Sequence, residues 1–492
     1  MDSLGLLQAG EVGFADLLDS PLHFAKAGHH SATSQYGQRI QHFLQRLIAE
    51  RILTTYRERT KRSRELFERA GKTLEGGTTR TSVFFSPYPC YVAEGKGCRF
   101  TDLDGNVRID FLNNFTSLMH GHAYPPVVEA VNRQIAKGSA YAAPSELEVE
   151  LAQMIQGRLP SLERLRFTSS GSEAVMFALR LARAFTGRRK IAKFEGGFHG
   201  SHELAQVSVG PSLDKAGPAE APRSVPDSAG IPSDWAEDVI IMPFNDAAAV
   251  ERILDRHAGT VAALIVEPII GAGGVIAPLP GFLKTLRDVT SARGILLIFD
   301  EIISLRVSLG GAQALYNVRP DLTTLGKIIS GGFPMAAFGG RADIMALLDP
   351  RSGAPAISQS GTFNAAVICC AAGVAGYSAI TPAVQVQIDD LAERLRREGN
   401  ALFRHLKVHG QIVGVGSLFN IHLTDEPIIN YRSVVGGDRK TLSMVALALM
   451  NRGIFIAPRG MGCTSSVMTH KDVAAFLQAL EGALIEDLEL GR

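Results

Sequence analysis

Lys327 is a residue whose surroundings suggest chemistry. It lies in the stretch DLTTLGKIISGGFPMAAFGG (321–340), where its neighbours are small or apolar and no acidic residue occurs within five positions. A lysine that is desolvated and lacks a carboxylate partner has a lowered pKa, and such lysines form Schiff bases with carbonyl groups. The alternative is a surface lysine without a chemical role, so residues elsewhere must decide.

A second candidate lies where a predicted strand runs directly into a predicted helix. In TSSGSEAVMFALRLA (168–182) the turn consists of Ser170, Gly171 and Ser172. The free N–H groups and the dipole of a helix N-terminus bind anions, and small residues let a phosphate approach the backbone. A helix cap that starts at Ser169 or Ser170 uses the same residues, so the cap and the phosphate site remain alternatives.

Two further segments supply an aromatic ring and a carboxylate. Phe198 in FEGGFHG follows two glycines and precedes His199, and its ring could stack on a flat heterocycle. A core phenylalanine is the more common case. Asp300 ends the apolar run of LLIFDEI, where a desolvated carboxylate needs a cationic or donor partner. Ile302, two residues on, is expected on the same side of the strand, where it could cover the opposite ring face.

Taken together, these segments are the parts of a pyridoxal phosphate (PLP) site. A phosphate cradle, a stacking ring, a buried carboxylate and an imine-forming lysine hold this cofactor. Asp300 would pair with the pyridine nitrogen and keep it protonated. An apolar strand that ends in Asp-Glu also occurs in ATPases, but that function needs a GxxxxGK[ST] loop upstream, and the sequence contains none.

Composition excludes several other classes of protein. The net charge of +1 over 492 residues provides no overall field for nucleic acid or a membrane. The five cysteines form no CxxC pair and no metal-ligand spacing, which predicts reduced thiols in a cytoplasmic protein without a metal site. The first residues lack the pattern of a signal peptide. The apolar stretch 365–380 is shorter than a bilayer span and predicts a buried helix.

Strand-like and helix-like segments alternate through the middle of the chain. The predicted strands are 165–168, 190–194, 238–244, 262–268 and 295–301, and the predicted helices are 172–187, 246–258 and 281–294. This alternation predicts an α/β fold with a large, mostly parallel sheet flanked by helices. The ligand site of such a sheet lies at the carboxyl ends of its strands.

The remaining segments predict the domain organisation. We expect an N-terminal extension (1–55), the N-terminal part of a small domain (56–110), a large PLP-binding domain (111–384) and a C-terminal small α+β domain (385–492). Residues 38–70 read as one long amphipathic helix, which argues against a DNA-binding helix-turn-helix and a ligand-sensing regulator. Five prolines in 209–236 indicate a long surface excursion that is either a wall of the site or disordered.

The motifs SSGSEA, GGFHG, VEPIIGAGG, FDEI, TTLGK and QSGTFNA resemble the class III, fold-type I PLP-dependent aminotransferases. The resemblance implies that Lys327 carries the cofactor as a Schiff base, that Asp300 binds the pyridine nitrogen and that Phe198 stacks on the ring. It also implies a phosphate site formed by Ser170, Gly171 and Ser172, with His199, Glu267 and Ile302 nearby. Glu267 has a structural hydrogen-bonding role as its alternative. Thr362 would reach the phosphate of the neighbouring subunit, which implies a homodimer.

Within that family the sequence is similar to the glutamate-1-semialdehyde aminomutases, and nearer still to the β-amino-acid aminotransferases. The segments that carry this likeness are 76–89, 338–353 and 455–460. The resemblance implies that Arg80 and Arg459 bind carboxylates, for which a guanidinium is well shaped. The aminomutase pattern NSPVR is replaced by TTRTS. We therefore expect transfer of an amino group from a carboxylate-bearing amine, such as a β-amino acid, to pyruvate or 2-oxoglutarate. The alternative is a PLP-dependent aminomutase or racemase.

Overall fold

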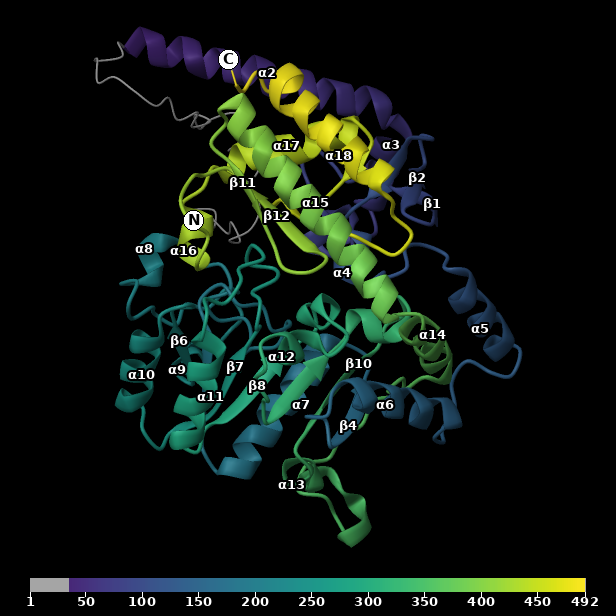
Figure 1. Ribbon diagram of the computed structural model, residues 1–492, viewed down its shortest axis with the longest axis vertical. Coiled ribbons are helices and arrows are strands. Elements are labelled where there is room, and N and C mark those ends of the chain that lie inside the picture. The colour runs from purple at the N-terminus through teal and green to yellow at the C-terminus, as the bar shows by residue number, and fades with distance from the viewer. Residues whose placement is uncertain (1–34, 492) are drawn as a thin grey trace.

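The large sheet contains seven strands and confirms the α/β prediction. The computed structural model describes residues 35–491, so the first 34 residues of the predicted extension lie outside the described part (Figure 1). The strands are β4 (Arg164–Thr168), β5 (Lys190–Phe194), β6 (Val239–Met242), β7 (Val261–Val266), β8 (Leu296–Asp300), β9 (Leu322–Leu325) and β10 (Ala336–Gly340). Their order is β4-β10-β9-β8-β7-β5-β6. β10 is antiparallel to both its neighbours, and the strands from β9 to β6 pair in parallel.

Helices cover both faces of this sheet, which explains why its strands are so apolar. All six residues of β7, VAALIV, are buried, as expected for a strand between two helical layers. The packed helices are α7 (Gly171–Thr186), α10 (Ala247–Arg256) and α11 (Phe282–Ala292). Phe177 of α7 stacks on Phe338 of β10, with ring centroids 5.5 Å apart. α10 and α11 pack in a separate apolar cluster around Phe194 and Leu286.

Two small sheets lie in the other half of the molecule, which combines segments from both ends of the chain (Figure 1). One sheet has the order β1-β2-β3-β13 and the other β11-β12-β14. Their strands are β1 (Val92–Lys96), β2 (Arg99–Asp102), β3 (Val107–Asp110), β11 (Gln411–Val413), β12 (Leu418–His422), β13 (Ile454–Phe455) and β14 (Met461–Cys463). β13 runs parallel to β3, so residues that are far apart in the sequence become neighbours.

Long helices complete this half. They are α2 (Gln35–Arg59), α3 (Lys61–Ala70), α15 (Pro382–Leu406), α17 (Arg439–Asn451) and α18 (His470–Gly482). The aromatic residues buried in the shared core are Tyr56, Tyr88, Phe111, Phe403, Phe419 and Phe476. The remaining α-helices are α5 (Pro125–Ile135), α6 (Glu146–Arg158), α8 (Leu213–Ala216), α9 (Ser233–Glu237), α12 (Gly311–Leu315), α13 (Ala342–Met345), α14 (Val367–Ser378) and α16 (Tyr431–Val435).

The single long helix predicted near the N-terminus is wrong, because the chain breaks into α2 and α3 at Thr60. Thr60 is buried and has φ −129° and ψ 43°, outside the helical region. The carboxylate of Asp104, in the turn of the β2–β3 hairpin, accepts hydrogen bonds from the backbone N and Oγ of Ser63 at 3.1 and 2.8 Å. The Asp104 carboxylate thus caps the N-terminus of α3. A tertiary contact therefore separates α3 from α2.

The proline-rich segment 209–236 is fixed to its surroundings. The Asp227 carboxylate accepts hydrogen bonds from the N–H groups of Val209 and Gly210 at 2.6 and 3.0 Å. Arg432 of α16 donates to Gly217 O at 2.8 Å. These contacts hold the start of the segment as a wall of the cavity described below, which is one of the two alternatives that the sequence left open.

The apolar stretch 365–380 forms α14, and most of this helix is buried against α5 and α6. Within residues 35–491, no single helix is both long and apolar enough to span a membrane. The bent pair of α14 and α15 meets those criteria of length and composition only when the two helices are taken together.

Candidate active site

Lys327 lies just beyond the carboxyl end of β9. It opens a short 3-10 turn, Lys327–Ser330, after Gly326. Its backbone is left-handed, with φ +50°, a conformation that costs about 1 kcal/mol for a residue with a side chain. Burial lowers the pKa of the Lys327 amine to about 8, although Asp300 and Glu267 oppose this change and Arg459 adds to it. The side chain is therefore a half-buried amine with a substantial neutral fraction near pH 8.

Asp300 ends the neighbouring strand β8 and is held by three donors. His199 Nδ1 lies 2.8 Å from one carboxylate oxygen, and the other oxygen accepts from Thr324 Oγ1 at 3.0 Å and from the Ile302 N–H at 3.2 Å. Burial lowers the pKa of His199, so its ring is neutral and donates through Nδ1. These donors fix the orientation of the carboxylate at the edge of the sheet.

Glu267 follows β7 and orders the turn that carries Phe198. Its two carboxylate oxygens accept hydrogen bonds from the N–H groups of Phe198, at 2.9 Å, and Gly271, at 3.1 Å. Burial, followed by the nearby Asp300 charge, raises the pKa of Glu267 to about 8. The Phe198 ring itself is 40% exposed and lines a cavity.

The start of α7 shows the cap and leaves room for an anion. Ser170 Oγ accepts from the Glu173 N–H at 3.3 Å, as an N-cap does. A Cβ added to Gly171 would lie 2.7 Å from Ile302 Cδ1, so the Ile302 side chain packs against the backbone of this turn. Ser172 Oγ accepts from the Ser201 N–H at 3.0 Å, which ties the helix start to the turn after Phe198. The first N–H groups of a helix have no partners within it and remain available to a phosphate.

Arg80 and Arg459 meet at one aromatic ring although 379 positions separate them in the sequence (459 − 80). Their guanidinium carbons lie 5.9 and 5.7 Å from the ring centroid of Phe115, within the range of a cation–π contact. Arg80 Nη1 also donates to Asn114 Oδ1 at 3.3 Å. The arrangement brings both predicted carboxylate ligands to one side of the site.

Phe115 is a site residue that the sequence analysis missed. It belongs to the turn Asn113–Thr116 (α4 in Figure 1), whose four residues have φ values of 50°, 48°, 53° and 72°. Each left-handed residue costs roughly 1–2 kcal/mol, so distant contacts must hold the turn. The Asn113 N–H donates to Asp110 Oδ1 and the buried Arg306 Nη1 donates to Thr116 O, both at 2.8 Å. The two asparagines, which tolerate this conformation, were the available signal.

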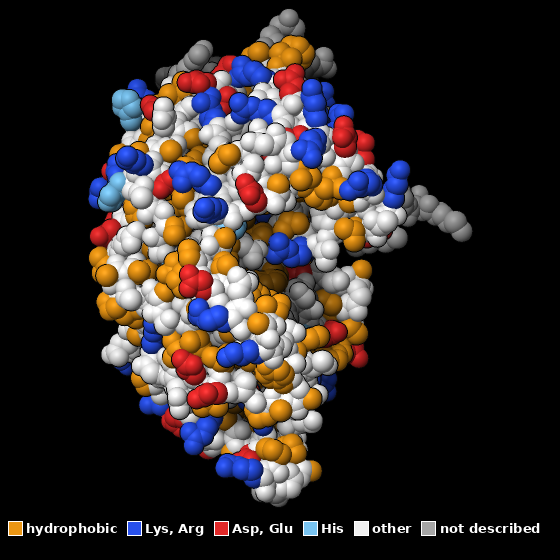
Figure 2. Space-filling view, turned by 90° about the vertical axis from the view of Figure 1, so that its right-hand side faces the viewer, with side chains coloured by type: hydrophobic (Ala, Val, Ile, Leu, Met, Phe, Trp, Pro, Cys, Tyr) orange, Lys and Arg blue, Asp and Glu red, His pale blue; other side chains and the backbone are white. Residues whose placement is uncertain are grey.

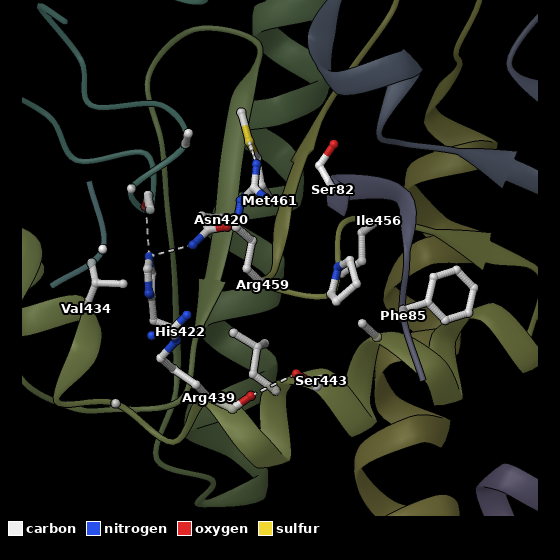
Figure 3. A pocket seen from close by; sticks show the side chains of 18 of the residues that line it. Ser82, Phe85, Asn420, His422, Val434, Arg439, Ser443, Ile456, Arg459 and Met461 are labelled. Atoms are coloured by element: carbon white, nitrogen blue, oxygen red, sulfur yellow. Dashed lines mark hydrogen bonds between the residues drawn. The ribbon is translucent and has the colours of Figure 1, made fainter. Parts of the chain in front are cut away.

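These groups surround a cavity of about 520 Å³ between the large sheet and the small sheets. Figure 2 shows a hollow near the middle of one face, with hydrophobic side chains and a basic side chain at its edge. The lining includes Lys327, Phe198, Phe115, Arg80, Arg459, Ile303, Asn420, His422, Tyr431, Arg439 and several apolar residues of α17. The polar side chains of β12 and α17 are drawn in Figure 3.

The comparisons with known proteins identify the family. Residues 83–484 match the family model described as Aminotransferase class-III. The chain belongs to this family.

Relatives of known name and structure support this assignment. A glutamate-1-semialdehyde 2,1-aminomutase from Methanothermobacter thermautotrophicus is 39% identical over 426 residues, which cover 86% of this chain and 99% of the relative. An omega-transaminase from Sphaerobacter thermophilus is 44% identical, with a TM-score of 0.84 over 87% of this chain and 98% of that one. A β-phenylalanine aminotransferase from Variovorax paradoxus is 34% identical, with a TM-score of 0.81 over 89% and 96% of the two chains.

The fold is that of the fold-type I enzymes of this family, and the cofactor is PLP. A transaminase solved with PLP bound is 35% identical and has a TM-score of 0.82 over 88% of this chain and 99% of that one. The residues of this class III enzyme fit the cofactor. Lys327 provides the amine, the buried Asp300 provides a carboxyl group, and Gly171 places bare backbone at the start of α7, where a phosphate can approach the N–H groups.

The aminotransferase brings together most, though not all, of the predicted site residues. Lys327, Phe198 and both arginines line one cavity, with Asp300, Glu267 and His199 buried beside it. Ile302 does not line it, because β8 ends at Asp300 and the strand alternation stops there; Ile303 does. Thr362 is exposed and does not line the cavity of its own chain, and the neighbouring Phe363 is 62% exposed.

Proposed function

We propose that this enzyme is a transaminase that moves the amino group of a β-amino acid to an oxo acid such as pyruvate or 2-oxoglutarate. The observation that carries the proposal is that Arg80, Arg459 and Lys327 line one cavity. An amine donor must place its nitrogen at the lysine while its carboxylate reaches a cation, and two guanidinium groups serve that purpose. The similarity to a β-phenylalanine aminotransferase supports the same substrate class.

We assign Lys327 as the catalytic residue that binds the cofactor covalently. PLP, when bound, withdraws the electrons that remain on the substrate carbon when it loses a proton. Once the donor amine has replaced Lys327 on the cofactor, the freed Nζ would take that proton from the amine-bearing carbon and return it at the cofactor carbon that receives the amine. Its lowered pKa of about 8 suits both directions of this transfer.

The neighbouring residues orient the cofactor in this proposal. Asp300 pairs with the pyridine nitrogen, and His199 holds the Asp300 carboxylate in place. Phe198 stacks on the ring, and Glu267 fixes the backbone of Phe198. Ile302 stays a predicted neighbour of the ring.

The phosphate is bound from two sides in this proposal. Ser170, Gly171 and Ser172 donate to it at the start of α7. Thr362 of a second copy completes the phosphate site, so the working enzyme is a homodimer. The exposure of Thr362 and Phe363 supports an interface there. We also propose the cytoplasm as its location, since the five cysteines are free thiols.

A second candidate is an intramolecular transfer, because a curated relative at 39% identity is named as an aminomutase. One observation separates the two reactions. A mutase or racemase turns over a single substrate without an oxo acid, whereas a transaminase stops after one half-reaction.

The substrate class is tested by a donor panel. The holoenzyme is mixed with α-amino acids, β-amino acids or plain amines, and the loss of the visible absorbance of the bound cofactor is followed. β-Amino acids are expected to react fastest. Fastest reaction with plain amines would show that the two arginines do not select a carboxylate.

A further inference from the structure

The part of the cavity beside α17 contains a guanidinium that the proposed mechanism does not use. Arg439 is the first residue of α17 and lines the cavity. In the described part of the chain, its side chain takes part in no hydrogen bond or ion pair. Its backbone does: the N–H donates to Gly437 O at 3.0 Å and the carbonyl oxygen accepts from Ser443 Oγ at 3.0 Å. In Figure 3 the Arg439 side chain extends toward His422. An unpaired guanidinium in a cavity is available to an anionic ligand.

The positive charge of the cavity also favours a ligand that carries more than one carboxylate. The basic side chains that line it are Lys327, Arg80, Arg459 and Arg439. Among the described lining residues one is acidic, Asp438, and its carboxylate accepts from the N–H and Oγ1 of Thr441 at 3.0 and 2.6 Å as the cap of α17. When Lys327 holds the cofactor and one substrate carboxylate lies at Arg80 and Arg459, the Arg439 guanidinium still has no carboxylate partner among the described lining residues.

Asn420 provides a second, independent sign of a polar ligand. It is 1% exposed, lines the cavity, and its Oδ1 has no hydrogen-bond partner within residues 35–491, while its Nδ2 faces His422. His422 Nε2 lies 2.9 Å from both the Asn420 amide and Gly274 O. Burial lowers the pKa of His422 to about 4, so the ring is neutral and its Nε2–H donates to Gly274 O. Because Nε2 carries a hydrogen, the Asn420 amide satisfies it better when its oxygen, and not its NH₂ group, faces His422. In this orientation the NH₂ group of Asn420 is available to donate to a ligand.

We propose that Arg439, together with the Asn420 amide, binds a second carboxylate, so that the oxo-acid acceptor of this enzyme is a dicarboxylate. The inference rests on the proposed transaminase function, since it assigns the acceptor of the same site. Arg439 takes the carboxylate remote from the reacting carbon, and apolar residues of α17 such as Leu442 and Leu447 line the path of the carbon chain. A cavity of about 520 Å³ is within the usual range for such ligands.

The binding test uses the PLP-loaded enzyme and does not require turnover. Binding of glutarate, an unreactive dicarboxylate, and butyrate, a monocarboxylate of similar length, is measured by calorimetry. The variant Arg439→Met removes the proposed ligand, and Arg397→Met, on an exposed part of α15, removes an equal charge outside the cavity. We expect Arg439→Met to weaken glutarate binding by about tenfold or more, as for a lost charged hydrogen bond, and to leave butyrate binding unchanged. Arg397→Met should change neither.

The kinetic test compares acceptors with a fixed amino donor. In Arg439→Met the Michaelis constant for the dicarboxylate acceptor, 2-oxoglutarate, should rise by about tenfold or more, while that for pyruvate stays the same. Arg439→Lys keeps the charge without the planar fork and should restore part of the loss. Retention of the visible absorbance of bound PLP in each variant shows that the site is folded.

Two results would overturn the inference: equal glutarate binding by Arg439→Met and the unchanged enzyme, or no preference of the unchanged enzyme for glutarate over butyrate. Failure of the proposed function looks different. Arginine-dependent glutarate binding, combined with no transamination for any acceptor, would support the subsite and reject the reaction.

Discussion

The Asp300 carboxylate accepts a hydrogen bond from Nδ1 of His199 over 2.8 Å, and both side chains are buried. The pair is formed by two segments that are about 100 residues apart, one after β5 and one at the end of β8. Burial lowers the pKa of His199, so the neutral imidazole acts as a donor that orients the carboxylate. Asp300 can then offer a fixed negative charge to the protonated nitrogen of a heterocycle.

His199→Leu should weaken PLP binding by about tenfold, because it removes a charged hydrogen bond worth roughly 1.5–3 kcal/mol. The dissociation constant is measured by titrating PLP into the apoenzyme. His202→Leu is the matched control, since His202 is a nearby histidine whose pKa burial also lowers, to about 4, and whose Nε2 has no hydrogen-bond partner in the described part of the chain. Equal PLP affinity in both variants would exclude a positioning role for His199.

Lys327→Ala should abolish both turnover and the visible absorbance of the bound cofactor. Lys193 is an internal control, because burial also lowers its pKa to about 8. Its Nζ, however, donates hydrogen bonds to Ala205 O and Val207 O at 3.1 and 2.6 Å and is not available to the cofactor. Borohydride reduction of the holoenzyme, followed by peptide mapping, should therefore place the pyridoxyl group on Lys327 alone. An adduct on Lys193, or none at Lys327, would refute the assignment.

The rate of PLP incorporation into the apoenzyme should rise with pH and level off above about pH 8. The reason is that the neutral Lys327 amine is the nucleophile, and its pKa is lowered from the ordinary value to about 8. Below pH 8 the rate should change about tenfold per pH unit, as expected for one ionisation. Stopped-flow absorbance between pH 6 and 9 measures the profile; a rate that still rises tenfold per pH unit at the upper end would mean that the lysine is not desolvated.

Arg459→Lys and Arg80→Lys should each raise the Michaelis constant for a β-amino acid by about tenfold, because lysine cannot reproduce a bidentate contact. The double variant decides whether the two arginines act on one carboxylate. Both guanidinium groups lie against Phe115, so a shared carboxylate should make the two effects clearly non-additive. Additive effects in steady-state kinetics would indicate separate half-reactions.

Phe363→Asp should separate the proposed homodimer. Phe363 is 62% exposed beside Thr362, and an aspartate there would place two charges at an interface between copies. Light scattering should then give the mass of one chain, and PLP affinity should fall as Thr362 of the partner is lost. A mass of two chains with unchanged PLP affinity would contradict the placement of the interface at this loop.

Much of the fold followed from local patterns in the sequence. The predicted strands β4 to β8 and the helices α7, α10 and α11 occur close to the expected residues. These elements are short apolar or amphipathic runs that end at glycines and polar residues, and both kinds of signal lie within a few neighbours along the chain. Lys327 and Asp300 could be predicted for the same reason, since Lys327 lies just after one such strand and Asp300 ends another.

Other features depend on contacts between distant segments, and the tertiary structure alone decided them. The helix break at Thr60 coincides with the contact to the Asp104 carboxylate, and the left-handed turn that presents Phe115 is held by the buried Arg306. The meeting of Arg80 with Arg459, and the position of Arg439 in the same cavity, likewise result from the packing of segments that are not neighbours in the sequence. Local propensity determines which helices and strands form. Which side chains share the site depends on tertiary contacts, because packing and hydrogen bonds must stabilise the fold by more than the locally strained turns cost.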